Sequence, residues 1–223
     1  MNSKMEDSGT SSVLRRQILE LTGRKDDWWY SGMLDRSVCG HTLSAWERKD
    51  VERGCMNAAA AACRAVQYWF GEKTPMAAAE ALGLKIRCAK QDDLFGSKNI
   101  LGFYDPKTTT VCMCEDTITS IEQFINGQGL NDLLGRYSIF EVALLHEIYH
   151  SLEDRIPGIY TRSRMLHRKI FFVFPVRVGL DAASEIGAIH FSKLMSRLPF
   201  SPCVYTWLLL VLNGRTLPDA WRI

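Results

Sequence analysis

The sequence predicts a mostly helical α+β fold in which a small antiparallel sheet lies beside one motif-bearing helix. Long stretches in both halves of the chain place apolar residues at helical spacing, and two of them begin with capping boxes. Short runs rich in strand-forming residues are confined to residues 84–114. A helical segment then carries His146-Glu147-Ile148-Tyr149-His150, which reads H-E-x-x-H.

Length and composition limit the domain count and the classes of partner. The 223 residues with 47% hydrophobic content can bury one core, so we expect a single domain over residues 13–223 after a disordered tail at 1–12. The net charge of +2 argues against direct nucleic-acid binding. No apolar stretch is long enough for a membrane, and seven scattered cysteines without a signal core indicate reduced thiols in the cytoplasm.

Helices dominate the first third of the domain. Residues 13–22 predict a short helix, and residues 44–70 predict a long one. Ser44 and Glu47 form a capping box at the start of the long helix. A further helix begins at Thr74-Pro75 and ends at Gly83, because proline suits the first helical position and glycine suits the end.

Three short strands follow these helices. Residues 84–89 read as one strand, and residues 100–104 and 109–114 form a hairpin around Asp105-Pro106-Lys107. In zinc peptidases, an edge strand beside the metal commonly holds an extended peptide by main-chain pairing. We expect residues 109–114 to be that strand.

The H-E-x-x-H segment has the signals of a complete helix. Ser138 is followed three residues later by Glu141, which is a capping-box pattern, and Pro157-Gly158 end the helix. Histidines four residues apart project from one helix face, so His146 and His150 can bind one metal ion. The intervening glutamate lies at the edge of that face, where it can reach a metal-activated water.

A catalytic zinc site needs a third protein ligand and an open position. The next strong helix spans residues 180–197, and Glu185 lies on its packed face, so we expect Glu185 to be that ligand. Asp181 is an alternative ligand, a carboxylate that orients a histidine, or a helix cap. Glu153 and Asp154 read as a solvated helix end. His190 lies about 140° round the helix from Glu185, which argues against a shared metal.

These residues predict one Zn²⁺ ion and hydrolysis of a protein or peptide substrate, with Glu147 as the general base. Four side chains remain open as stabilisers of the oxyanion or as outer partners of the ligands: Tyr149, Tyr160, His167 and His190. Two alternatives stand beside this hypothesis. One is a weakly active or inactive metal-binding regulatory module of the same fold, and the other is a structural helical protein with an accidental motif.

The order of the elements resembles the ImmA/IrrE family of minimal zinc metallopeptidases. The resemblance rests on four segments: T-P-M-A-A-A-E-A-L-G-L-K-I (74–86), L-G-F-Y-D-P-K-T-T-T-V (101–111), L-L-H-E-I-Y-H-S-L (144–152) and E-I-G-A-I-H-F-S-K-L-M (185–195). They cover a catalytic core of about residues 74–197, preceded by a helical extension over residues 13–73.

The resemblance implies a minimal zincin-like core and a gluzincin-type site. In that site His146, His150 and Glu185 are zinc ligands and Glu147 is the base. It also implies a cytoplasmic protease, of a family that often cleaves a DNA-bound transcriptional repressor. The segment between His150 and Glu185 is longer than is usual in the family, and it contains residues 160–178.

Overall fold

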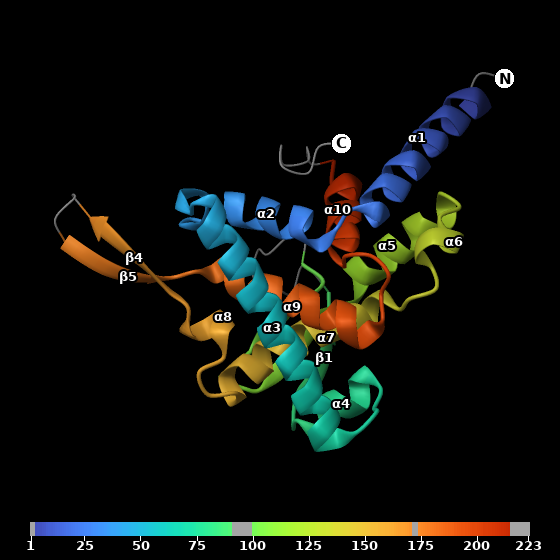
Figure 1. Ribbon diagram of the computed structural model, residues 1–223. Coiled ribbons are helices and arrows are strands. Elements are labelled where there is room, and N and C mark those ends of the chain that lie inside the picture. The colour runs from blue at the N-terminus through green and yellow to red at the C-terminus, as the bar shows by residue number, and fades with distance from the viewer. Residues whose placement is uncertain (1–2, 91–99, 171–173, 215–223) are drawn as a thin grey trace.

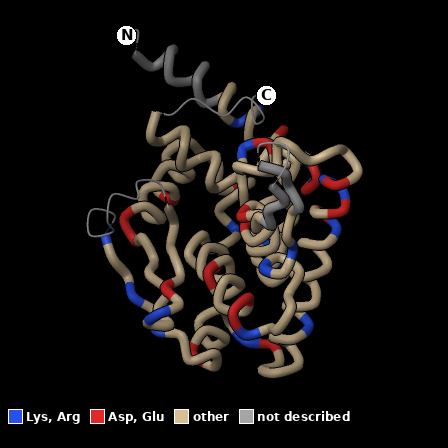
Figure 2. The backbone as a smooth tube through the Cα atoms, turned by 90° about the vertical axis from the view of Figure 1, so that its left-hand side faces the viewer, with Lys and Arg blue, Asp and Glu red and all other residues tan. Residues whose placement is uncertain are grey.

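The computed structural model confirms the mostly helical α+β fold (Figure 1). It describes residues 3–90, 100–170 and 174–214, with side chains described from residue 12 onward except at 167–170 and 174–177. Within these ranges no helix is both long and apolar enough to cross a membrane. Lys and Arg positions are interspersed with Asp and Glu positions on the face in Figure 2, in keeping with the nearly balanced charge.

The helices and strands follow in chain order. They are α1 (Ser3–Gly23), α2 (Asp26–Arg36), a short 3₁₀ turn η1 (Gly40–Thr42), α3 (Ala45–Phe70), α4 (Pro75–Ala81), β1 (Lys85–Ala89), β2 (Gly102–Asp105), β3 (Thr110–Cys114), α5 (Glu115–Gly127), α6 (Asn131–Leu134), α7 (Ile139–Arg155), α8 (Tyr160–Ser163), β4 (Met165–Ile170), β5 (Phe174–Gly179), α9 (Asp181–Ser196) and α10 (Cys203–Leu212).

The core is built around α9, which packs against α3 on one side and against α7 on the other (Figure 1). The alanine-rich centre of α3 permits this close approach, since Ala59 and Ala62 are fully buried. The expected capping box at Ser44 and Glu47 is present at the start of α3. Helix α7 in turn packs against β2 and β3, so one helix joins the helical layer to the sheet.

The small sheet is mixed, with strand order β1-β3-β2. Strand β3 pairs in parallel with β1 and antiparallel with β2. The expected hairpin is therefore confirmed, but the expectation that residues 109–114 form an edge strand is wrong. Those residues form the central strand, with main-chain partners on both sides. The edge strand that lies against α7 is β2.

Two segments differ from the sequence expectation. Residues 3–12, expected to be a disordered tail, belong to α1, which is anchored further along by the buried side chains of Leu14, Ile18 and Leu21. A helix nucleated by such packing extends at little cost, because each added residue gains one hydrogen bond. The long segment after α7 contains the β4–β5 hairpin, whose strands pair antiparallel and extend away from the body (Figure 1).

Candidate metal centre

Helices α7 and α9 bring the three expected ligands together. Ser138 caps α7 by accepting a hydrogen bond from the backbone N–H of Glu141 at 3.2 Å, as expected. The helix then presents His146 and His150 one turn apart on one face. Helix α9 runs alongside and supplies Glu185. Among the described residues, His146, His150 and Glu185 are the group of side chains whose ligand atoms converge closely enough to hold a metal ion.

The separations of these atoms suit a tetrahedral zinc ion. The Nε2 atoms of His146 and His150 lie 3.2 Å apart. One Glu185 carboxylate oxygen lies 3.3 Å from His146 Nε2, and the other lies 3.6 Å from His150 Nε2. Ligands bound tetrahedrally at 2.0–2.2 Å are about 3.3–3.6 Å apart. The donor set of two imidazoles and one carboxylate therefore fits zinc in chemistry and in spacing.

The charge of Glu185 favours a positive charge among the three converging side chains. Burial lowers the pKa of His146, but the hydrogen bond and charge of Glu185 outweigh this effect and raise the pKa to about 9. Burial likewise raises the pKa of Glu185, but His146 outweighs it and lowers the pKa to about 2. Without a metal, a proton on His146 offsets the repulsion between converging lone pairs. A metal ion would displace that proton.

Glu147 lies directly beside the ligand cluster. Its carboxylate is buried, and this burial raises its pKa even though the two neighbouring histidines oppose the rise. The backbone of Tyr104 in β2 forms a hydrogen bond with it. A Cβ at Gly102 would lie 2.9 Å from the carbonyl oxygen of Cys112 on β3, whereas its distance of 3.5 Å from Glu147 Cγ would be an ordinary contact. Glu147 therefore lies beside His146, His150 and Glu185, which is the position that the sequence predicts for it.

A cleft of about 640 Å³ opens onto this cluster. Its walls come from β2, α7, α9, α10 and the end of α2. The lining includes the apolar side chains of Met33, Ile189 and Leu209 and the polar side chains of Tyr104 and Arg162. Asp181 also lines the cleft as an exposed side chain. It is the first residue of α9 rather than its N-cap, which is Leu180, and it lies outside the group of converging ligands.

The expectation that Glu153 is a solvated helix end is wrong. Its side chain is fully buried, with one carboxylate oxygen 3.1 Å from His150 Nδ1. The Ser184 hydroxyl donates to the same oxygen at 2.6 Å, and Arg162 Nε donates to it at 3.2 Å. Sequence reasoning missed this role because Glu153 follows His150 by three residues near a helix end. That spacing does place it on the side of α7 that faces α9.

Tyr149 extends the same network away from the cleft. Its hydroxyl lies 3.2 Å from the hydroxyl of Thr161, and Thr161 donates to Glu153. Tyr149 is fully buried against α9, where Gly187 makes room for it, because a Cβ at that position would lie 2.6 Å from the Tyr149 hydroxyl oxygen. Tyr149 is therefore an outer partner of the site and not a residue of the cleft wall.

Tyr160 does not reach the ligand cluster. Its ring lies on α3 at Gly54, where a Cβ would come within 2.3 Å of the ring. Its hydroxyl donates to the backbone oxygen of Asp50 at 3.5 Å. These contacts dock α8 onto α3 and give Tyr160 a packing role. The side chain of His167, the third oxyanion candidate, lies outside the described residues.

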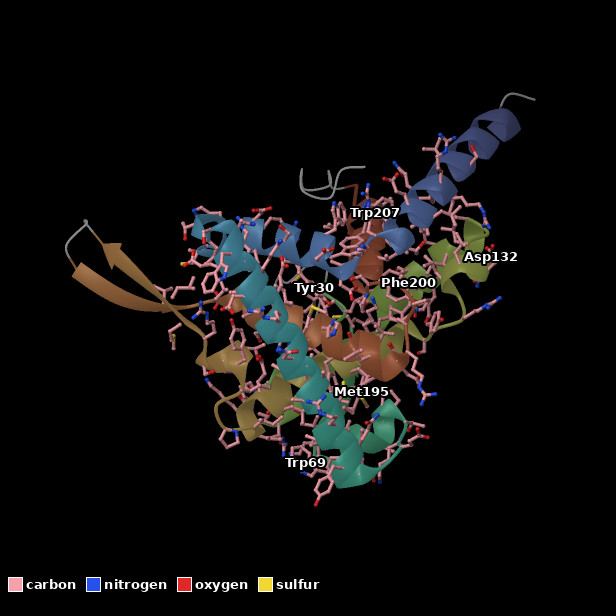
Figure 3. The ribbon with its side chains drawn as sticks, in the orientation of Figure 1. Tyr30, Trp69, Asp132, Met195, Phe200 and Trp207 are labelled. Atoms are coloured by element: carbon pink, nitrogen blue, oxygen red, sulfur yellow. The ribbon has the colours of Figure 1, made fainter. Side chains whose placement is uncertain are left out.

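His190 belongs to a second polar cluster, buried between α9 and α2. Its Nδ1 lies 2.9 Å from the Tyr30 hydroxyl, and Figure 3 shows Tyr30 where α2 passes α9. Lys193 donates to the two oxygens of Asp26 at 2.7 and 2.8 Å, and Asp26 is 3.8 Å from His190. Burial lowers the pKa of His190. His190 is therefore not among the cleft-lining candidates for the oxyanion.

Comparison with protein-family models, with curated proteins and with solved structures finds no match to this chain.

Proposed function

We propose that this protein is a zinc-dependent metallopeptidase that hydrolyses a peptide bond in a protein or peptide substrate. The observation that carries this proposal is the convergence of His146, His150 and Glu185 at separations of 3.2–3.6 Å beside a buried glutamate. Two neutral imidazoles and a carboxylate form a typical catalytic zinc donor set, which leaves one position for water or substrate.

A bound zinc ion would polarise the scissile carbonyl and increase the acidity of the attacking water. Glu147 accepts the proton of that water and passes it to the departing amine. Its raised pKa suits this exchange, because a base whose pKa lies closer to the working pH can both take and return a proton. The surrounding cleft walls limit water around the carboxylate, which strengthens its interaction with the proton.

The substrate would bind in an extended conformation along β2. This strand is an edge of the sheet, and Gly102, Phe103 and Tyr104 line the cleft that contains the ligand cluster. An edge strand offers unpaired N–H and C=O groups, so an added peptide strand gains main-chain hydrogen bonds without regard to its sequence. The apolar side chains in the cleft wall would then contact hydrophobic side chains of the substrate.

The resemblance to the ImmA/IrrE family supports the same reading and suggests a transcriptional repressor as the substrate class. All seven cysteines are free thiols, which suits a protein acting in the reducing cytoplasm. The chain's own charges give no separate reason to expect direct DNA contact, because its net charge is only +2.

The test compares zinc content and peptide cleavage in the wild type and in Glu147→Gln. We expect near-stoichiometric zinc in both proteins, because Glu147 is not a ligand. We expect cleavage of unfolded protein to fall by about 10²–10⁴-fold in the variant, since that range is typical for loss of a general base. Glu141→Gln removes an exposed carboxylate from the same helix and serves as the matched control.

The outcomes separate the alternatives. Full cleavage by Glu147→Gln would contradict the assignment of the base. Zinc binding without cleavage by the wild type would favour a metal-binding regulatory module. If the folded wild type bound no zinc, the remaining alternative would be a structural protein in which the H-E-x-x-H motif is accidental.

A further inference from the structure

We propose that Glu153 is a positioning residue of the metal centre, whose carboxylate holds the His150 imidazole so that Nε2 faces His146 and Glu185. This role rests on the proposed zinc site. It assigns a function to a buried side chain that the catalytic scheme does not use.

The carboxylate of Glu153 is held from three directions. Ser184 on α9 donates to one oxygen at 2.6 Å, Arg162 on α8 donates to it at 3.2 Å, and Thr161 donates to the other oxygen. Its side chain has no solvent exposure. A carboxylate with donors from two neighbouring helices has one orientation, and it stays ionised because each donor stabilises the charge.

The fixed carboxylate determines which nitrogen of His150 carries the proton. Two oxygen atoms face His150 Nδ1: a carboxylate oxygen of Glu153 at 3.1 Å and the Ser184 hydroxyl oxygen at 3.2 Å. The carboxylate accepts hydrogen bonds, and Ser184 directs its own proton to Glu153, so Nδ1 is the donor to this pair. The neutral ring then has its lone pair on Nε2, the atom that converges with His146 and Glu185. Metal-binding histidines commonly have such a partner on the second nitrogen, and its loss typically costs about 10- to 100-fold in metal affinity.

A purely structural role for Glu153 would have a different signature. Its bonds to Thr161 and Arg162 could simply fasten α8 onto α7. Loss of that fastening would lower stability while leaving zinc affinity and the His150 tautomer unchanged. Zinc affinity and tautomer are therefore the measurements that distinguish a positioning residue from a packing residue.

The decisive variant is Glu153→Gln in the full chain. The amide keeps the size of the side chain but can donate as well as accept, so it no longer fixes the proton on Nδ1. Zinc dissociation constants are measured by competition with a chromophoric chelator. The tautomer of His150 is read from long-range ¹H–¹⁵N correlations in the zinc-free protein. Asp154→Asn is the matched control, because it removes the neighbouring carboxylate, which bonds Arg162 and not His150.

We expect Glu153→Gln to weaken zinc binding by about 10- to 100-fold and to populate the Nε2–H tautomer, with Asp154→Asn close to wild type. Equal zinc affinity and an unchanged tautomer in Glu153→Gln would overturn the positioning role alone. Equal weakening in Asp154→Asn would also overturn it, because loss of charge would then be the cause. A folded wild type that binds no zinc would overturn the proposed function together with this role.

A second variant covers the case in which Glu153→Gln does not fold. Thr161→Val keeps the shape of the side chain and removes the hydroxyl that donates to Glu153. We expect a smaller weakening of zinc binding, of a few-fold, and partial loss of the Nδ1–H tautomer. Unchanged values for both quantities in this variant would count against the positioning role.

Discussion

Helix α9 contributes to two polar clusters. Each combines histidine with a carboxylate, but the clusters differ in what they can bind. Glu185 converges with His146 and His150 at the cleft, and every one of these side chains can supply an acceptor atom. His190, farther along the same helix, lies against Tyr30, while Lys193 and Asp26 form an ion pair beside it. The second cluster pairs each acceptor with a donor from the protein itself.

The difference shows what distinguishes a site from a stable core in this fold. Burial and charged residues are common to both clusters, so neither property identifies the metal centre. The distinguishing property is the convergence of three side chains that can each offer an acceptor atom to one point, which a bound cation would satisfy. In the cluster at His190, the Tyr30 hydroxyl forms a hydrogen bond with His190 and Lys193 donates to Asp26, so these polar groups have partners within the protein.

The comparison is tested most strongly by removing one histidine from each cluster. We expect His146→Ala to weaken zinc binding by more than about 100-fold, since loss of a direct ligand exceeds the effect of losing an outer partner. We expect His190→Ala to bind zinc like the wild type. Zinc titration by chelator competition measures both variants, and equal loss in the two would remove the distinction between the clusters.

The next effect concerns Gly187, which lies between Glu185 and His190 on α9 and packs against Tyr149. Gly187→Ala would place a Cβ 2.6 Å from the Tyr149 hydroxyl and 2.8 Å from Thr161. We expect a loss of about 1–3 kcal/mol in the free energy of unfolding, which is the usual cost of overpacking a core. Chemical denaturation measures it. Gly127→Ala is the control, because a Cβ at Gly127 meets no neighbour within 4 Å.

A smaller effect on stability is expected from removing one hydrogen bond of the cluster at His190. Tyr30→Phe removes the hydroxyl that lies 2.9 Å from His190 and leaves that ring nitrogen without its partner. We expect a loss of about 0.5–1.5 kcal/mol in the free energy of unfolding, which is the usual net contribution of one hydrogen bond. Zinc affinity should not change. A shift in zinc affinity would mean that the two clusters are coupled through α9.

The smallest effect is a pH dependence that belongs to His190. Burial lowers its pKa in the folded protein, against the charge of Asp26 and with that of Lys193. The unfolded chain, with a pKa of about 6.5, therefore takes up this proton first as the pH falls. The stabilisation is present above about pH 6.5 and is lost as the pH falls through the folded pKa.

The measurement compares unfolding of the zinc-free wild type and His190→Gln at several values between about pH 7 and pH 5. We expect the wild type to lose stability more steeply than the variant over this interval. Parallel curves would show that His190 makes no contribution to the pH dependence.

Local signals in the sequence were sufficient for several of the helices and for the three side chains that converge. The cap at Ser138 and the spacing of His146 and His150 are properties of a single helix, and both are present as expected. Glu185 converges with the two histidines as expected, but its side chain is half exposed and not packed. The long helix α3 followed equally from its capping box and its alanine-rich centre.

Properties that depend on two distant segments were not predictable in the same way. Glu153 resembles a solvated helix end until Thr161 and Ser184 are placed around it by α8 and α9. Strand order depends on the parallel pairing of β1 with β3, which no local pattern of either strand specifies. Tyr160 and His190 were plausible cleft residues by type, but Gly54 and Tyr30 hold them elsewhere.

The position of β2 at the sheet edge has a consequence for the timing of any cleavage. A peptide can pair with this strand only if its own backbone hydrogen bonds are open over several residues. A segment that is helical or buried in its own protein must unwind first, and the free energy of that local opening reduces the population that can be cut. For the proposed peptidase activity, the conformational stability of the substrate would then set the rate, so a signal that loosens the substrate would start proteolysis without any change in this protein.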